Sequence, residues 1–341
     1  MLKRWQFWLG IAVSAVFLYL ALRGLHLGEV WQTVKTARYL WLLPGIAVYF
    51  VGVWARAWRW HYLLRPLKKI PTRSMFPIVT IGYMGNNVFV ARAGEVLRAA
   101  ILKDRESVPI SASLATVVVE RIFDAVVMLG FVFFNLGALE NLTHNSGFIG
   151  NIQQLAIWGS VIFIGALVVF LLAAMFPLVT ERIVIQIIDR VIPLRIRDKT
   201  RGIAIKFLTG LESLRSPKDA LMVLVTTVII WLLETGKYWF VMQGFDFQVS
   251  FFALMLMNGI VNIATTLPSA PGYIGTFDGP GIAVLAAYGV PAEIAAGYTL
   301  VLHAALWFPI TILGAYYYLR QPLRWGKDLE KIKHDQETQP V

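Results

Sequence analysis

Two stretches decide the fold: GYMGNNVFVARAGEVLR at residues 82–98 and GIVNIATTLPSAPGYIGTFDGPG at residues 259–281. Both are apolar, both are interrupted by glycine, and each carries a carboxylate. Such interruptions are too frequent for a plain membrane-spanning helix, because irregular backbone at membrane depth must be buried in protein or line a wet cavity. The two stretches therefore predict a pair of facing re-entrant hairpins.

The composition surrounding these stretches is that of a helical membrane protein. The chain has 341 residues, of which 57% are hydrophobic and only 15% are charged. Apolar runs of about 18 residues or more recur, and a helix of that length crosses the hydrocarbon of a bilayer. There is no cysteine, which excludes disulfides and cysteine-bound metals. The net charge of +11 is concentrated in loops between apolar runs, which favours anionic lipid over nucleic acid as the partner.

The predicted fold is an all-α polytopic membrane protein with about six full spans and two re-entrant hairpins. The hairpins are expected at about residues 76–92 and 251–289. The full spans are expected at residues 5–22, 40–60, 110–139, 155–176, 220–241 and 295–319.

Loop charges orient these segments in the cell membrane. Basic residues flank the first hairpin on both sides, whereas residues 238–319 contain no Lys or Arg. By the positive-inside rule the first hairpin enters from the cytoplasm and the second from outside, with both termini cytoplasmic. The linker at 177–218, with nine basic and four acidic residues, is expected to be amphipathic and cytoplasmic, as is the basic tail at 320–341. Residues 1–139 and 140–319 then form two halves of an inverted repeat.

Three charged residues, Glu120, Arg121 and Asp124, lie inside the predicted span at 110–139. At 1.5 Å per residue they are about 15 Å from the cytoplasmic face. Each costs at least about 2.5–3.5 kcal/mol in hydrocarbon, so all three should face a protein or water-filled interior. They form either a structural ion cluster or a polar lining in which Arg121 meets a phosphate.

Arg92, Glu95 and Arg98 follow at intervals of three residues, which predicts a ladder along one side of a helix that begins after Gly94. A helix N-terminus behind a glycine offers free N–H groups and a positive dipole, both of which suit phosphate. The alternative is that Arg92 and Arg98 are ordinary interfacial cations.

Asp278 is the single charge of the second hairpin, and His303 lies midway along the last span. Asp278 is a candidate binding residue, although a tight structural turn explains the neighbouring glycines equally well; His303 is either a packing residue or a ligand. Glu234 and Lys237 are expected to pair near the outer interface. The expected tip positions, which supply backbone or amide groups, are Asn86, Asn87, Gly94, Asn262, Pro271, Gly272 and Gly275. No catalytic residue, metal site or cofactor is predicted.

Three motifs together resemble the flippase-like membrane family that includes the membrane domain of lysylphosphatidylglycerol synthases, or multiple peptide resistance factors, and archaeal proteins linked to dolichol-bound sugars. They are Asn87 with residues 93–95 and Arg98, then Glu120-Arg121 with Asp124, and then residues 271–278 followed by Leu302-His303. The resemblance implies a polytopic bundle with re-entrant helices that handles anionic lipid-linked headgroups. Ala91, Asp278 and His303 depart from the family pattern, which often has proline, glutamate and arginine there.

The favoured hypothesis is a flippase-like transporter that moves an anionic phospholipid or a polyprenyl-phosphate-linked headgroup. The synthase family's soluble aminoacyl-transfer domain is missing after Leu319, so lipid aminoacylation by this chain alone is not expected. Two alternatives stay open. One is a membrane-embedded lipid-modifying transferase, and the other is an accessory subunit of a separate synthase or glycosyltransferase. The chain could also act as a homo-oligomer.

Overall fold

The computed structural model describes residues 5–89, 92–134, 152–267 and 269–320. Within these ranges the chain is helical and contains no strand, which confirms the predicted all-α class. Residues 135–151 and 321–341, which include the predicted end of the third span and the basic tail, lie outside the described residues.

Six long helices match the six predicted spans. They are α1 (Trp5–Leu22), α3 (Leu42–Leu64), α6 (Ile110–Phe134), α8 (Ile152–Met175), α11 (Pro217–Met242) and α14 (Ala292–Arg320). In the described part of the chain, α3 with its preceding turn, α11 and α14 are each long and apolar enough to cross a membrane, and two bent helix pairs bring the number to as many as five. The remaining helix, α6, carries Glu120, Arg121 and Asp124. The chain is a multi-pass membrane protein, while the exact set of spans stays a prediction.

One helix was not predicted. Residues 27–36 were expected to be a loop, but they form the amphipathic helix α2 (Leu27–Thr36), which is bent by 88° from α1. Glu29 lies in its first turn and Lys35 in its last, where each complements the helix dipole. Val30 is buried against α14, and Gly297 of that helix provides the necessary space: a Cβ there would lie 2.8 Å from Thr33 Cγ2.

The first hairpin consists of α4 (Thr72–Val88) and α5 (Ala93–Glu106), which pack against each other. The expected boundaries, 76–92, were therefore wrong: that range covers most of one arm and the break. Gly82 and Gly85 also do not interrupt α4; they let α5 approach. A Cβ at Gly85 would lie 2.8 Å from Gly94 Cα, and a Cβ at Gly94 would overlap the Gly82 carbonyl oxygen.

The second hairpin consists of α12 (Phe251–Ala264) and α13 (Asp278–Ala287), with the short 3₁₀ turn η3 (Pro271–Tyr273) between them. Ser250 caps α12 by accepting a hydrogen bond from the Ala253 N–H at 3.1 Å. Glycines are needed in the connection because Gly272 and Gly275 have φ values of 75° and 81°. The predicted range, 251–289, agrees with this unit.

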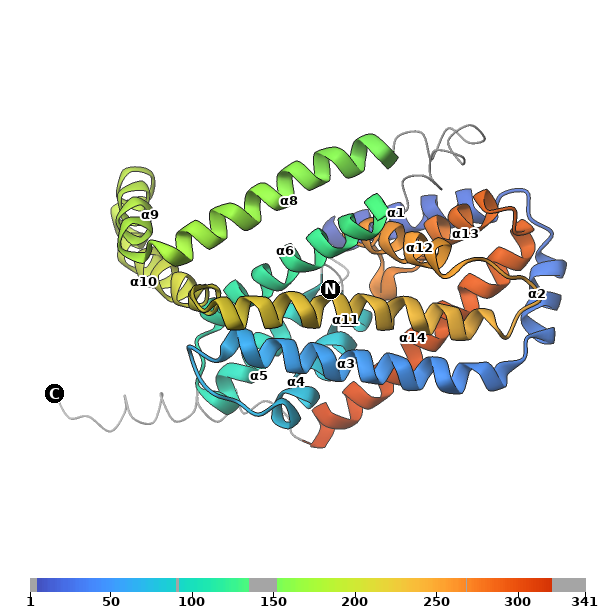
Figure 1. The fold of residues 1–341 in the computed structure, drawn as a ribbon, viewed down its shortest axis with the longest axis horizontal. Helices are drawn as coiled ribbons and strands as arrows, with labels where there is room; N and C mark the ends of the chain where they lie inside the picture. Colours follow the sequence, from blue (N-terminus) through green and yellow to red (C-terminus); the bar gives the residue numbers. More distant parts are fainter. Residues whose placement is uncertain (1–4, 90–91, 135–151, 268, 321–341) are drawn as a thin grey trace.

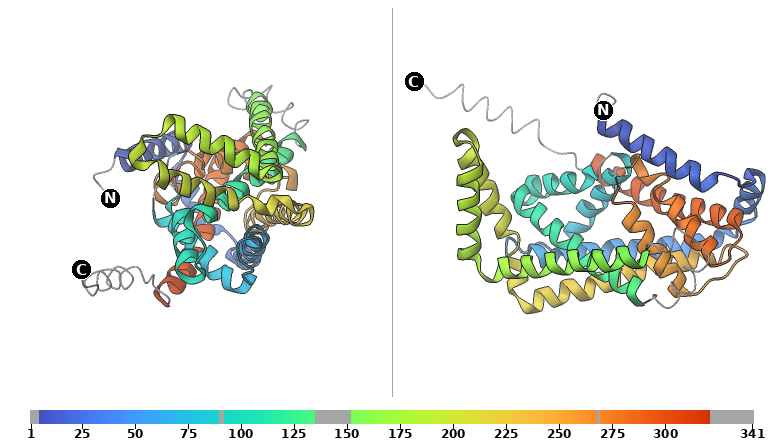
Figure 2. Two further views of the ribbon diagram at one scale, coloured as in Figure 1. Left: turned by 90° about the vertical axis from the view of Figure 1, so that its left-hand side faces the viewer. Right: turned by 90° about the horizontal axis from the view of Figure 1, so that it is seen from above.

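The helices lie around a long axis (Figure 1), with α2 at one end and α9 (Pro177–Val191) and α10 (Leu194–Thr209) at the other. These last two helices form most of the linker at 177–218, whose cytoplasmic location stays a prediction. Figure 2 shows α9 projecting sideways, and it is bent by 107° from the end of α8. The α4–α5 hairpin lies toward the α9–α10 end, and the α12–α13 hairpin toward the α2 end. Re-entrance, the two-half division and the inverted repeat stay predictions.

Candidate functional site

A polar cavity of about 140 Å³ lies where the two hairpins meet. Its walls come from both hairpins and from α3, α6, α11 and α14. Side chains from residues more than 200 positions apart in the sequence line it together. Asn87, at the end of α4, donates a hydrogen bond to Thr311 Oγ1 of α14 at 2.8 Å, which ties the first hairpin to the last helix.

Most of the predicted site residues converge on this cavity. The predicted residues that line it are Asn86, Asn87, Arg92, Glu95, Arg121, Asp124, Asn262, Gly272 and His303. Those outside its lining are Gly94, Arg98, Glu120, Pro271, Gly275 and Asp278. Arg98, Glu120 and Asp278 are at most 6% exposed, and each contacts a residue that lines the cavity. Gly275 instead packs on α1, where a Cβ would overlap the Ser14 carbonyl oxygen.

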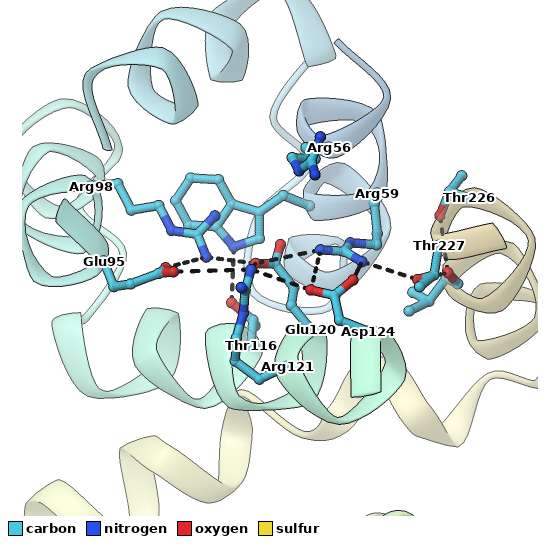
Figure 3. A network of polar contacts seen from close by, with 12 residues as sticks. Arg56, Arg59, Glu95, Arg98, Thr116, Glu120, Arg121, Asp124, Thr226 and Thr227 are labelled. Atoms are coloured by element: carbon cyan, nitrogen blue, oxygen red, sulfur yellow. Dashed lines mark hydrogen bonds and ion pairs between the residues drawn. The ribbon is translucent and has the colours of Figure 1, made fainter. Parts of the chain in front are cut away.

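Asp124 is neutralised by an arginine from another helix. Arg59 of α3 places its Nη1 atom 2.5 Å from Asp124 Oδ1 and its Nη2 atom 3.4 Å from Oδ2 (Figure 3). The same Nη1 donates to Thr227 Oγ1 of α11 at 3.0 Å, and Trp231 Nε1 donates to Asp124 Oδ1 at 3.0 Å. The network ties α3, α6 and α11 together, as expected if these charges form a structural ion cluster.

Glu120 completes the network on the other side. Its Oε2 atom lies 2.5 Å from Arg98 Nη2, and the same nitrogen lies 2.7 Å from Glu95 Oε2 (Figure 3). The Arg98 guanidinium also stacks 4.6 Å from the Trp60 ring centroid. Glu95 and Arg98 therefore pair along α5 as expected.

Arg92 does not join the predicted ladder. It adopts the left-handed region, with φ of 52°, immediately before α5, and its Nη2 donates to the Thr265 carbonyl at 3.2 Å. Its guanidinium lies 5.9 Å from the Tyr273 ring centroid. The left-handed turn redirects the side chain, so Arg92 links the first hairpin to the tip of the second.

Sequence reasoning missed Arg56 and Arg59, which lie one turn apart within α3. The signal was present, since two arginines inside an apolar span must face a polar interior. Arg56 Nη2 lies 2.7 Å from Glu234 Oε1, while the other carboxylate oxygen of Glu234, Oε2, pairs with Lys237 Nζ. Glu234 and Lys237 pair as predicted; they are at most 7% exposed and line the cavity, while their depth in the membrane stays a prediction.

Three arginines that line the cavity have a hydrogen-bond donor without a partner among the described residues. Arg56 Nη1, Arg92 Nε and Arg121 Nε are buried and have no hydrogen-bond partner among the described residues. The lining contains four basic residues, Arg56, Arg92, Arg121 and Lys237, against three acidic ones, Glu95, Asp124 and Glu234. Excess positive charge with free guanidinium N–H groups in a small polar space suits an oxyanion such as a phosphate.

No metal site coincides with the cavity in the described ranges. Among the described residues, one group has metal-ligand geometry: His26, Glu29 and Glu293, whose candidate ligand atoms lie within 4.8 Å of one another. It is largely exposed, at the α2 end of the molecule.

The chain is similar to a glycosyltransferase and to several membrane proteins from archaea. It is 25% identical over 300 residues to the glycosyltransferase AglD of Haloferax volcanii, covering 80% of this chain but only 47% of that relative. It is 24% identical to a UPF0104 membrane protein of Methanothermobacter thermautotrophicus, covering 81% and 82% of the two chains. A UPF0104 membrane protein of Methanocaldococcus jannaschii is 22% identical, with 75% and 77% covered.

No solved structure matches the chain. The family model of the lysylphosphatidylglycerol synthase TM region matches residues 7–314, nearly the whole of the described chain. This match confirms the resemblance inferred from the three motifs, and the chain belongs to the lysylphosphatidylglycerol synthase TM region family.

Proposed function

We propose that the protein is a flippase-like transporter of the cytoplasmic membrane that binds the phosphate of an anionic phospholipid or polyprenyl-phosphate-linked headgroup in the polar cavity. One observation carries the proposal: the wall of a polar space between the tips of both hairpins contains three arginines, each with a buried N–H group that has no hydrogen-bond partner among the described residues. Arg56, Arg92 and Arg121 receive the phosphate. Glu95 and Asp124 hold Arg121 in place, the latter at 3.3 Å.

Translocation follows from the arrangement of the hairpins. In the proposed topology both termini are cytoplasmic, the α4–α5 hairpin enters from the cytoplasm and the α12–α13 hairpin from outside. Movement of one hairpin or the other would open the cavity to one leaflet at a time, as in other transporters whose site lies between repeats. The bound phosphate would remain paired with arginine throughout, which avoids the cost of an isolated charge in hydrocarbon.

The test is leaflet-resolved translocation of fluorescently labelled phosphatidylglycerol in vesicles of phosphatidylcholine and phosphatidylglycerol that contain the purified protein. Dithionite bleaches the outer-leaflet label, and the protected fraction falls as lipid moves outward. Arg121→Ala and Arg56→Ala should slow this movement at least tenfold, as expected for loss of a charge-assisted hydrogen bond of about 1.5–3 kcal/mol. Arg201→Ala, which changes an arginine of α10 outside the cavity, is the control and should translocate at the unaltered rate.

Movement that is equally fast in Arg121→Ala, Arg56→Ala and the unaltered protein would overturn the proposal. The assay is repeated with a labelled polyprenyl phosphate, because the cavity recognises the phosphate that both lipid classes share. Whichever probe depends on Arg121 identifies the class.

A second candidate is an accessory subunit that works beside a separate glycosyltransferase. One observation favours it: the chain spans about half the length of AglD, which is named as a glycosyltransferase. This candidate predicts a chemically altered lipid when the protein and its partner enzyme are incubated with lipid extract, detected by mass spectrometry. Transport alone leaves the mass of every lipid unchanged.

A further inference from the structure

His303 has hydrogen-bond acceptors at both of its ring nitrogens. Nδ1 lies 2.8 Å from Asp278 Oδ1, and Nε2 lies 2.7 Å from the Gly272 carbonyl oxygen. A neutral imidazole has one N–H and can donate to only one of these acceptors, whereas the imidazolium donates to both. The second Asp278 oxygen accepts a hydrogen bond from the Gly275 N–H at 2.9 Å, which favours the ionised carboxylate. The geometry therefore fits a charged His303–Asp278 pair.

The Gly272 carbonyl belongs to a turn that is strained and borders the cavity. Gly272 and the following residue, Tyr273, both lie in the left-handed region, with φ of 75° and 62°. That conformation costs of order 1–3 kcal/mol for a residue with a side chain, so the turn persists only where its surroundings hold it. The bond from His303 Nε2 is one such restraint. Phe277 covers the imidazole, with the ring centroids 4.5 Å apart.

We propose that a proton held by the His303–Asp278 pair latches the Pro271–Tyr273 turn against α14, and that loss of this proton releases the tip of the second hairpin. When the proton leaves the imidazolium for water in the cavity, neutral His303 keeps a single N–H. If Nδ1 keeps it, the bond to the Gly272 carbonyl is lost; if Nε2 keeps it, Nδ1 and the Asp278 carboxylate face each other as two acceptors. Either way one of the two bonds breaks, and the latch weakens as pH rises.

Of the charged groups around His303, Asp278 is the one for which the described residues show a direct contact. The other titratable or charged groups reach it only across the cavity, from every neighbouring element. They are Tyr49 and Arg56 of α3, Tyr83 of α4, Arg92 before α5, Glu95 of α5, Arg121 and Asp124 of α6, Glu234, Lys237 and Tyr238 of α11, and Tyr273 of η3. Because these groups also respond to pH, the test must isolate His303.

This inference deepens the proposed function, since it makes opening of the second hairpin depend on a proton. Its functional meaning rests on that function, but the latch itself does not. If lipid movement fails while the latch responds to pH, only the proposed function falls. If lipid moves while the tip ignores pH, only the latch falls.

The experiment uses the absence of cysteine in the chain. Spin labels are placed at Ile274→Cys, beside the turn, and Val51→Cys, on α3; both native side chains are exposed. Pulsed dipolar spectroscopy then measures the distance between the labels in nanodiscs at about pH 5 and about pH 9, on either side of the ordinary histidine pKa. The expected result is one narrow distribution at low pH, and at high pH a shift of more than about 2 Å, the size of an ordinary loop rearrangement.

Three variants isolate the histidine. His303→Arg keeps a permanent charge and several N–H donors, so it should give the narrow low-pH distribution at both pH values. His303→Ala and Asp278→Asn remove the donor and the carboxylate, and each should give the shifted distribution at both. An unshifted distribution in the unaltered protein at high pH overturns the proposal. So does a pH response in His303→Arg equal to that of the unaltered protein.

Discussion

Arg56 and Arg59 lie one helical turn apart on α3, yet their surroundings differ. Arg59 is 1% exposed and points both terminal nitrogens at Asp124. Arg56 pairs with Glu234 through one terminal nitrogen, its other terminal nitrogen has no hydrogen-bond partner among the described residues, and the residue lines the polar cavity. An arginine inside a membrane helix can therefore hold helices together or line a cavity where an anion could bind, and here Arg56 lines the cavity whereas Arg59 does not.

The largest expected effect tests the structural side of this comparison. Arg59→Ala leaves the Asp124 carboxylate without its main partner and should reduce the free energy of unfolding by about 3–5 kcal/mol. Thermal unfolding of the protein in detergent measures the loss. The control is Arg201→Ala, which breaks an arginine–aspartate pair with the same 2.5 Å approach but with side chains 36% and 35% exposed. That variant should lose at most about 1 kcal/mol. Equal losses in the two variants would contradict the structural role of Arg59.

The next largest expected effect tests the proposed role of Arg56 in binding an anion. Arg56→Gln removes the charge but leaves Lys237 to neutralise Glu234. We expect binding of a labelled anionic lipid to weaken by about tenfold to a hundredfold, the equivalent of about 1.5–3 kcal/mol, with a smaller change in thermal stability than in Arg59→Ala. Arg56→Lys should recover part of the affinity, because it restores the charge without the planar fork. Tight lipid binding by Arg56→Gln would remove the functional distinction between the two arginines.

A third prediction concerns the close contact that brings the arms of the first hairpin together. Gly94→Ala places a methyl group on the Gly82 carbonyl oxygen and should cost at least about 1–3 kcal/mol of stability. Gly165→Ala, in α8 with open space around it, is the matched control and should change stability by at most about 1 kcal/mol, toward greater stability. Similar melting curves for the two variants would mean that α4 and α5 do not approach as closely as described.

The sequence allowed most helices to be predicted, because apolar runs and caps are local features. Loop charges predict that the two hairpins enter the membrane from opposite sides, and this orientation stays a prediction. The bounds of the first hairpin were misplaced because Gly82 and Gly85 were taken as helix breaks. Their actual role, clearance for Gly94 in another helix, is a tertiary property that a local pattern does not reveal.

The candidate site was predicted in part for the same reason. Arg92, Glu95, Arg121 and Asp124 were found because charges stand out in apolar segments, and they do line one cavity. Their partners were harder to find: which carboxylate faces Arg59, or which carbonyl accepts from His303, depends on helix packing between distant segments. Arg56 and Arg59 were overlooked although the same rule applied to them.

The smallest expected effect concerns the wall of the cavity. Asn87→Ala removes the hydrogen bond to Thr311 and should cost about 0.5–1.5 kcal/mol of stability. A double-mutant cycle with Thr311→Val isolates the pair: the double variant should lose less than the sum of the two single losses. Strict additivity would show that the tie between the first hairpin and α14 contributes nothing.

The most direct test of the central claim is a cryo-electron microscopy map of the protein in nanodiscs that contain phosphatidylglycerol. The account predicts headgroup density inside the polar cavity, with the phosphate within hydrogen-bond distance of Arg56, Arg92 or Arg121. Headgroup density confined to the outer perimeter of the bundle, with the tips of the two hairpins apart, would contradict it.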